Sequence, residues 1–124
     1  MTFWVLVGLG GALGALSRYA LANLVYRRTG TGFPWGTLVV NTCGCFLLGV
    51  VVTVAGASSL EAQVLALVAI GFLGDFTTFS TFAYETVMLA RDREWTRAIV
   101  YQAGSLGLGV LAVVAGLACG SWLR

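Results

Sequence analysis

Four long apolar segments, separated by short polar stretches, constrain the fold of this 124-residue chain more than any other feature. The hydrocarbon core of a bilayer requires about 20 apolar residues in a helix, and each segment reaches that length. Because the connections are short, neighbouring helices should run antiparallel. The sequence predicts an all-α membrane protein in which residues 1–124 form one four-helix transmembrane domain. The expected spans are residues 3–26, 36–57, 62–90 and 97–122.

The composition indicates that lipid, not water, surrounds most of the surface. Hydrophobic residues make up 59% of the chain, charged residues only 10%, and the mean hydropathy is +0.93. A soluble domain usually carries charge on about a quarter of its residues. The cationic residues are all Arg and are scattered, which gives no indication of nucleic-acid binding. The first residues contain no basic stretch, so we do not expect a cleaved signal peptide.

Small residues are concentrated inside the predicted spans. Gly10 and Gly14 form a small-xxx-small pair, which permits close approach of two helix backbones in lipid. We interpret the cysteines as small apolar packing residues, with a metal site or a disulfide as the less favoured alternative. They are Cys43, Cys45 and Cys119.

The third segment contains a polar run near its middle. Residues 71–82 combine two glycines, Asp75 and four hydroxyl residues, a mixture that holds a continuous helix poorly. A broken helix is tolerated at membrane depth only where protein or a polar cavity covers it, and its freed backbone groups can bind ions. We therefore expect a helix broken near its centre, with Asp75 as a candidate N-cap of the second half. The alternative is a continuous helix whose Ser and Thr side chains bond to its own carbonyls.

Aromatic and hydroxyl residues alternate along the end of this run. Three phenylalanines recur at every third position and should lie roughly on one face, with hydroxyl residues between them. Aromatic rings have a positive edge, so ring edges and hydroxyl donors together could line an anion path that lacks a fixed cation. The residues are Phe76, Phe79 and Phe82 with Thr77, Ser80 and Thr81.

Other polar residues lie deep in the predicted spans. Asn41 in the second span either bonds to another helix or contacts an anion, and the sequence leaves these two roles open. Glu85 follows Thr81 by four residues, deeper than an ordinary loop charge. In the fourth span, Tyr101 and Ser105 lie on one helical face.

At these residues the chain closely resembles the Fluc family of fluoride channels, also called CrcB-type proteins, over nearly its whole length. The first span carries Gly-Gly-x-x-Gly-Ala-x-x-Arg-Tyr at residues 10–19, and the second carries Gly36-Thr37-Leu38 followed by Asn41 and Gly44. The third span carries Gly71-Phe72, then Thr-Thr-Phe-Ser-Thr-Phe at residues 77–82, and then Glu85. The fourth span carries Tyr101 and Ser105.

The resemblance implies a passive channel in the prokaryotic plasma (inner) membrane that exports cytoplasmic fluoride and confers fluoride resistance. It also implies an antiparallel dimer with two fluoride pathways and a break in the third helix near residues 74–78. By similarity, Asn41, Phe79 and Phe82 contact permeating fluoride. Thr37, Ser80, Thr81, Tyr101 and Ser105 would extend a polar track, with Glu85 near its end.

The resemblance further implies a structural Na⁺ at the centre of the dimer. Backbone carbonyls of the broken helix would bind it, and these correspond to Gly74 and Thr77. Asp75 departs from the family pattern, since a small uncharged residue is expected there. Its charge could tighten the sodium site, or it could only cap the half-helix.

Two other functions are weaker candidates. A proton-coupled transporter of the small multidrug-resistance type needs an acid in its first helix, whereas Arg18 is the ionisable side chain of residues 3–26. A non-transporting structural subunit would not require the cluster of polar and aromatic residues described above. We do not expect an enzyme, because the chain has no His and no evident nucleophile–base pair or phosphate loop.

The arginines predict a fixed orientation in the membrane. The first and third connections must lie on one side, and they and their flanks hold five arginines against one, plus the α-amino group, on the other side. Lys and Arg in short loops favour the cytoplasm, so both termini should lie outside. A chain of fixed orientation would need an oppositely oriented paralogue to build an antiparallel dimer; a homodimer is the alternative. The five are Arg27, Arg28, Arg91, Arg93 and Arg97, and the sixth is Arg124.

Overall fold

The computed structural model describes residues 1–57 and 62–123, and the regular elements of these residues are helices. Four stretches are long and apolar enough to cross a membrane, which confirms the predicted spans: Thr2–Thr29, Trp35–Gly56, Ala62–Arg91 and Trp95–Trp122. The predicted connection between the second and third spans, which contains Ser58, Ser59 and Glu61, lies outside the described residues. The elements are α1 (Thr2–Thr29), α2 (Trp35–Ala57), α3 (Ala62–Leu65), η1 (Ala66–Leu73), α4 (Gly74–Phe76), α5 (Phe79–Arg91) and α6 (Trp95–Trp122).

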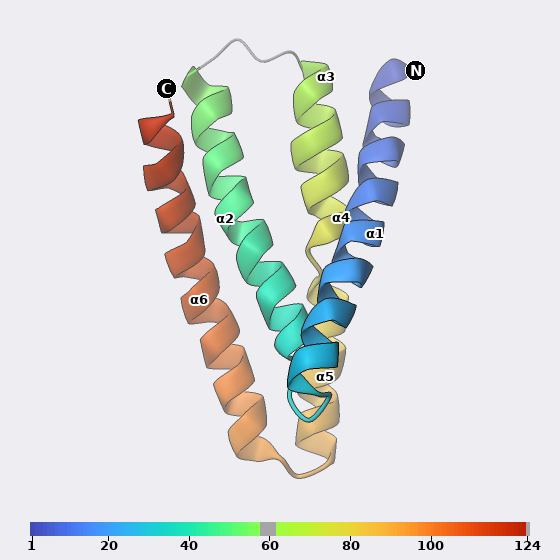
Figure 1. The fold of residues 1–124 in the computed structure, drawn as a ribbon, viewed down its shortest axis with the longest axis vertical. Helices are drawn as coiled ribbons and strands as arrows, with labels where there is room; N and C mark the ends of the chain where they lie inside the picture. The colour runs from blue at the N-terminus through green and yellow to red at the C-terminus, as the bar shows by residue number, and fades with distance from the viewer. Residues whose placement is uncertain (58–61, 124) are drawn as a thin grey trace.

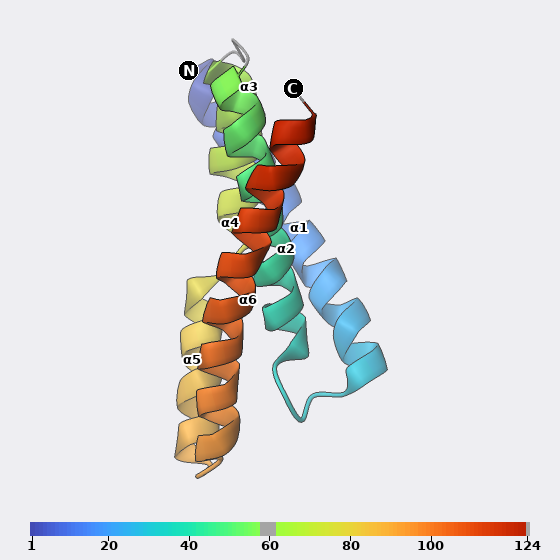
Figure 2. The ribbon, with the colours of Figure 1, turned by 90° about the vertical axis from the view of Figure 1, so that its left-hand side faces the viewer.

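The helices run antiparallel along the long axis of the molecule. Figure 1 shows both termini at one end, and the α1–α2 and α5–α6 connections at the opposite end. The most extensive pairings are α2 with α6 and α1 with η1, and α1 also packs against α2 and α4. The third span therefore packs its first half on α1, while α5 lies beside the first part of α6 (Figure 2).

Glycines allow these pairs of helices to approach closely. A Cβ added at Gly10 would collide with the Leu67 carbonyl oxygen, and one at Gly14 with the Phe72 carbonyl oxygen. On the other pair, a Cβ at Gly116 would collide with the carbonyl oxygen of Phe46 on α2. The predicted small-xxx-small packing is thus confirmed for α1, because its glycines contact the backbone of the neighbouring helix.

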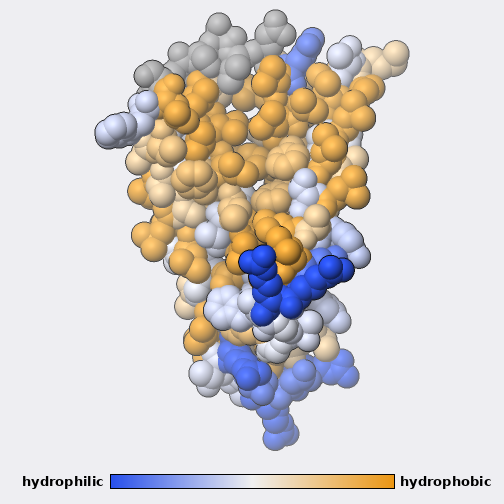
Figure 3. Space-filling model, viewed as in Figure 1, coloured by the Kyte–Doolittle hydropathy of each residue, from blue (hydrophilic) through white to orange (hydrophobic). Residues whose placement is uncertain are grey.

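The outer surface is apolar along most of the molecule. In Figure 3 hydrophobic residues cover the part nearer the termini, and hydrophilic residues gather mainly toward the end that carries the α1–α2 and α5–α6 connections. Large apolar side chains are open to the surroundings, such as Leu16 at 66% and Leu106 at 72% exposure. So extensive an apolar surface is stable only against lipid or a partner protein.

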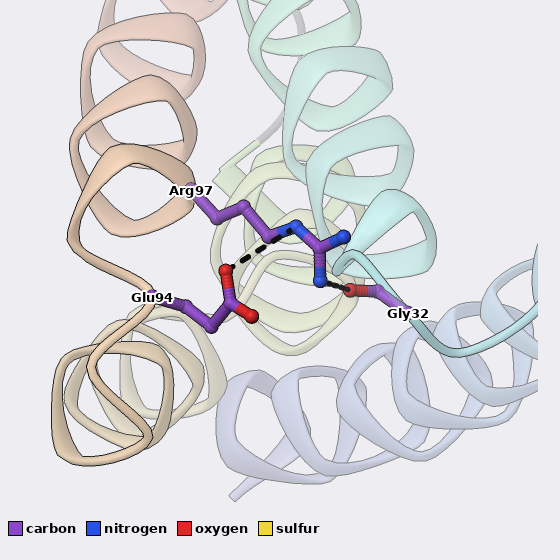
Figure 4. Close-up of polar contacts among 3 residues, drawn as sticks. All are labelled: Gly32, Glu94 and Arg97. Carbon is purple, nitrogen blue, oxygen red and sulfur yellow. Dashed lines mark hydrogen bonds and ion pairs between the residues drawn. The ribbon is translucent and has the colours of Figure 1, made fainter.

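The α1–α2 connection is held against the start of α6. The Arg97 guanidinium donates to the Gly32 carbonyl oxygen at 3.4 Å and forms an ion pair with Glu94 at 3.7 Å (Figure 4). The Phe33 ring meets the Tyr101 ring edge-on, with centroids 5.6 Å apart. Arg97 therefore lies in the first turn of α6 but belongs, by its contacts, to the end of the molecule that holds the two connections.

The third span is broken at two residues. α4 ends at Phe76, the next two residues are extended, with φ/ψ of −81°/159° at Thr77 and −147°/119° at Thr78, and α5 begins at Phe79. The predicted break is therefore present. Before it, η1 is a π-helix, which the sequence did not indicate.

The N-cap of the second half-helix is Thr78, so the prediction that Asp75 caps it is wrong. The Thr78 Oγ1 accepts a hydrogen bond from the backbone N–H of Thr81 at 3.2 Å. An N-cap residue directly precedes the first helical residue and is extended, whereas Asp75 lies inside α4. The Asp75 carboxylate instead lies against Gly11 of α1, where an added Cβ would collide with it.

Candidate functional site

A carboxylate on α5 gathers hydroxyl groups from three other helices. Glu85 Oε1 accepts from Tyr26 on α1 at 3.0 Å and from Thr37 on α2 at 2.9 Å. Its Oε2 accepts from Tyr101 on α6 at 2.7 Å. An ionised carboxylate is purely an acceptor, so it matches three O–H donors. The structure thus brings together three residues that the sequence had singled out, namely Thr37, Glu85 and Tyr101.

Tyr26 is the member of this cluster that sequence reasoning missed. It lies one turn before the end of α1, beside two arginines, where a tyrosine is easily taken for an interfacial anchor. Its ring packs against α2 at Gly36, where an added Cβ would come within 2.5 Å of the Tyr26 Cε2 atom. Gly36 was the sequence feature that could have indicated the position of the Tyr26 ring, but only if the packing of α1 against α2 had been known.

The side chain of Asn41 binds both backbone groups of Thr78 in the break. Asn41 Oδ1 accepts from the Thr78 N–H at 2.8 Å, and its Nδ2 donates to the Thr78 carbonyl oxygen at 2.9 Å. The interhelical role of Asn41 is therefore seen directly. An amide group has two N–H donors, so one remains for another acceptor, and anion contact stays a prediction.

Two carbonyls of the third span lose their helical donors through these contacts. In a continuous helix the Gly74 carbonyl would accept from the Thr78 N–H, which here donates to Asn41. The Thr77 carbonyl would accept from the Thr81 N–H, which here donates to the Thr78 side chain. Arg18 on α1 reaches the Thr77 carbonyl oxygen at 3.4 Å.

A cavity of about 510 Å³ lies on one side of the break, between α2, the third span and α6. The Phe79 and Phe82 rings border it, with centroids 5.9 Å apart, and Phe79 is 79% exposed. The Ser105 Oγ is buried and has no hydrogen-bond partner among residues 1–57 and 62–123. Asn41, Gln102, Gly74 and Thr77 also line this cavity.

The third phenylalanine of the predicted stripe lies elsewhere. Phe76 is buried at 5% exposure and stacks on Phe72, with ring centroids 5.6 Å apart. The single aromatic face predicted from the spacing is wrong for Phe76, because the extended residues between α4 and α5 change the direction of the chain. Phe79 and Phe82 stay together, and Phe82 also contacts the Tyr101 ring at 5.2 Å.

A second cavity, of about 300 Å³, lies on the α1 side of the break. Glu85, Tyr26 and Thr37 border it, and Arg18 is the cation in its lining. Thr81 faces this cavity, and its Oγ1 accepts from the Thr78 hydroxyl at 3.0 Å. Ser80, the remaining hydroxyl of the predicted track, has its Oγ 3.3 Å from the Thr78 Oγ1.

The cysteines are free thiols. Cys43 and Cys119 are exposed on the helix surface, and Cys45 is half-buried and lines the first cavity. A Cβ added at Gly109 on α6 would lie 3.5 Å from the Cys45 sulfur, an ordinary packing distance. This agrees with the interpretation of Cys45 as a small packing residue.

Comparison with known proteins identifies the family. The family model described as CrcB-like protein, Camphor Resistance, matches residues 5–117. The chain belongs to the CrcB-like family. It is 46% identical over 116 residues to the fluoride-specific ion channel FluC of Acidobacterium capsulatum, covering 93% of each chain. It is 43% identical over 123 residues to a protein of the same name from Thermus thermophilus, covering 99% of this chain and 98% of that one.

A third relative, the fluoride-specific ion channel FluC 1 of Thermobifida fusca, is 46% identical over 118 residues and matches 95% of each chain. Together with the four apolar helices, membership of this family makes the chain a multi-pass bacterial membrane protein. The chain spans nearly the whole length of these relatives.

Proposed function

We propose that this chain forms a passive, fluoride-selective channel that carries fluoride out of the cytoplasm and so confers fluoride resistance. The relatives that match it are named as fluoride-specific channels. The observation that carries the proposal is the buried Ser105 hydroxyl, which lacks a partner among the described residues. It borders the same cavity as the Asn41 amide and the Phe79 and Phe82 rings. These groups offer donors and positive ring edges without a full cation.

The chemistry of this lining suits a small, strongly hydrated anion. A channel has to replace the hydrogen bonds of the lost water, yet bind weakly enough to release the ion. A single hydroxyl, one amide N–H and two ring edges meet both requirements, because each is a neutral donor. The Glu85 cluster lies beyond Thr81, where its negative charge would limit how long an anion stays. We therefore propose a path from the Phe79 and Phe82 rings along Ser80 and Thr81 toward Glu85.

We further propose that the channel is an antiparallel dimer. In one protomer the first cavity is open at the break, where Gly74 is exposed and Phe79 is 79% exposed, and the neighbouring Ser80 is exposed as well. Polar groups exposed to hydrocarbon are costly, so a second protomer that covers this face would stabilise it. The partner would also close the open side of the first cavity.

Sodium as a structural ion fits the backbone of the break. The carbonyls of Gly74 and Thr77 have lost the amide donors of a continuous helix, and hard oxygen ligands suit a small cation. A Na⁺ held by these carbonyls from two protomers would tie the two breaks together. The Arg18 guanidinium, which reaches the same Thr77 carbonyl, has to move back from any such ion because both are positive.

The decisive experiment measures fluoride efflux from liposomes that contain the purified chain. Fluoride should leave rapidly after an electrical shunt is opened, whereas chloride under the same conditions should stay inside. Equal release of both anions, or no release of fluoride, would contradict the proposal. A dependence of the fluoride flux on a proton gradient would favour a coupled transporter instead.

A further inference from the structure

Two separate cavities meet at the start of α5, and one described residue lines both. The first, of about 510 Å³, contains the phenylalanine rings and Ser105, and the second, of about 300 Å³, contains Arg18 and Glu85. Within residues 1–57 and 62–123, Thr78 alone belongs to the lining of both. Its neighbours divide between them, since Thr77 borders the first cavity and Thr81 the second.

Thr78 is fixed in place on every side. It is 7% exposed, although it touches two cavities. Its N–H and its carbonyl both bond to the Asn41 side chain, at 2.8 Å and 2.9 Å, and its Oγ1 caps α5 through the Thr81 N–H at 3.2 Å. Moving this residue aside would break all three bonds at once, so its backbone and its Oγ1 form a fixed boundary between the two cavities.

The hydroxyl proton is the part of Thr78 that can move without disturbing the wall. It now points to the Thr81 Oγ1 at 3.0 Å, while the Ser80 Oγ lies 3.3 Å away as a second partner. A hydroxyl group can rotate its proton while its oxygen stays still. The oxygen can therefore keep capping α5 while the proton turns away from Thr81, which borders the second cavity.

We infer that Thr78 is the partition between the two cavities and that its hydroxyl proton passes the permeating anion from one to the other. This inference rests on the proposed fluoride channel and deepens it, because it names the residue at which the path crosses from one cavity to the other. The anion replaces the Thr81 Oγ1 as acceptor during passage, and the bond between the two threonines returns afterwards. No covalent bond changes, and the proton stays on Thr78.

The test compares three replacements that all keep an oxygen for the Thr81 N–H. Ser, Asn and Asp are all strong N-cap residues, so a purely structural role would leave the three alike. Thr78→Ser keeps the hydroxyl and should conduct fluoride within about twofold of the unmodified chain. Thr78→Asn places a longer planar amide across the passage and should be about fivefold slower or more than Thr78→Ser. Thr78→Asp adds a negative charge and should be about tenfold slower again, because it repels the anion.

Thr86 supplies the matched control on the same helix. Its hydroxyl donates to the Phe82 carbonyl at 2.8 Å, and it lies outside both linings. Thr86 is half-buried, and Thr86→Ser and Thr86→Asn should conduct fluoride within about twofold of the unmodified chain, because this residue borders neither cavity. Thermal stability and elution as a dimer in detergent are measured for every variant.

Fluoride efflux that is fastest in Thr78→Ser, slower in Thr78→Asn and slowest in Thr78→Asp, with similar thermal stability of the three variants, would support the role of Thr78 as the partition. Equal rates in the Thr78 variants, with efflux by the unmodified chain intact, would leave Thr78 as a helix cap only and overturn this inference alone. If Thr78→Asp does not fold, the comparison of Ser with Asn decides in the same way. An unmodified chain that releases no fluoride would overturn the proposed function and, with it, this inference.

Discussion

Replacing Asn41 by alanine tests whether this side chain holds the break or only contacts the anion. The change removes two hydrogen bonds, at 2.8 Å and 2.9 Å, and leaves the N–H and carbonyl of Thr78 without their partner. Thr78 is 7% exposed, so water reaches these groups poorly. Hydrogen bonds between membrane helices contribute about 0.6 kcal/mol each on average and up to about 1.7 kcal/mol. Loss of the two bonds alone would therefore lower the free energy of unfolding by about 1–3 kcal/mol.

A larger loss of unfolding free energy is expected if the buried polar groups of Thr78 are left without partners. Each such group costs about 1–3 kcal/mol, so the two together cost up to about 6 kcal/mol if both remain dry. We therefore expect Asn41→Ala to lower the free energy of unfolding by about 2–4 kcal/mol, a large effect for a single substitution. The Thr78 N–H would also become free to bond to the Gly74 carbonyl, so the proposed Na⁺ site would lose a ligand and stabilisation by Na⁺ would weaken in the same variant.

Equilibrium unfolding in detergent, with and without Na⁺, measures both effects. The control is Leu47→Ala on the same helix, where the side chain is 38% exposed and the truncation removes no hydrogen bond. The reasoning fails if Asn41→Ala abolishes fluoride flux while its unfolding free energy stays within about 0.5 kcal/mol of the unmodified chain. Asn41 would then be an anion ligand that contributes nothing to the geometry of the break.

The remaining predictions concern the lining, the break, the helix packing and the orientation. Phe79→Ile and Phe82→Ile should each reduce fluoride efflux, because an aliphatic side chain has no positive edge, and unchanged efflux in both would remove these rings from the path. Asp75→Asn should weaken the dependence of thermal stability on Na⁺ if the carboxylate charge supports the ion, whereas an unaltered dependence would exclude that role. Gly14→Val should lower the melting temperature, since its side chain collides with the Phe72 carbonyl, and an unchanged melting temperature would show that α1 can move away. Reporters fused to the C-terminus should signal mainly from outside the cell, and equal signals on both sides would show dual topology.

The fold followed from local sequence signals to a large extent. Hydropathy alone located four spans, because in lipid the length of an apolar run and the need to satisfy every backbone group leave few alternatives. The Gly and Thr run located the break, since these residues support a helix poorly. The structure brings Thr37, Glu85 and Tyr101 together through hydrogen bonds, and their role in a fluoride path stays a prediction.

The details that the sequence did not indicate depend on backbone direction and on distant neighbours. The N-cap of α5 is Thr78 and not the predicted Asp75, because the N-cap is the residue directly before the first helical residue, where the extended residues end. Phe76 does not lie on the same face as Phe79 and Phe82, because the three-residue spacing of a helix does not hold across a break. Tyr26 joined Glu85 from 59 positions away, a contact that only the packing of α1 beside α2 and α5 creates.

The distribution of arginines and the exposed residues at the break together indicate which kind of subunit the proposed partner is. Arg27 and Arg28 end α1, Arg91 ends α5, and Arg97 contacts the α1–α2 connection, so all four lie at the end of the molecule opposite the termini. Charges that gather at one end favour a single orientation in the membrane. In the proposed dimer, in contrast, a second protomer would cover the exposed site residues, and an antiparallel arrangement would invert that protomer. One chain cannot easily satisfy both conditions, because an inverted copy would place its arginines on the unfavourable side. A paralogous subunit with the opposite charge bias satisfies both, and we therefore expect such a subunit rather than a second copy of this chain.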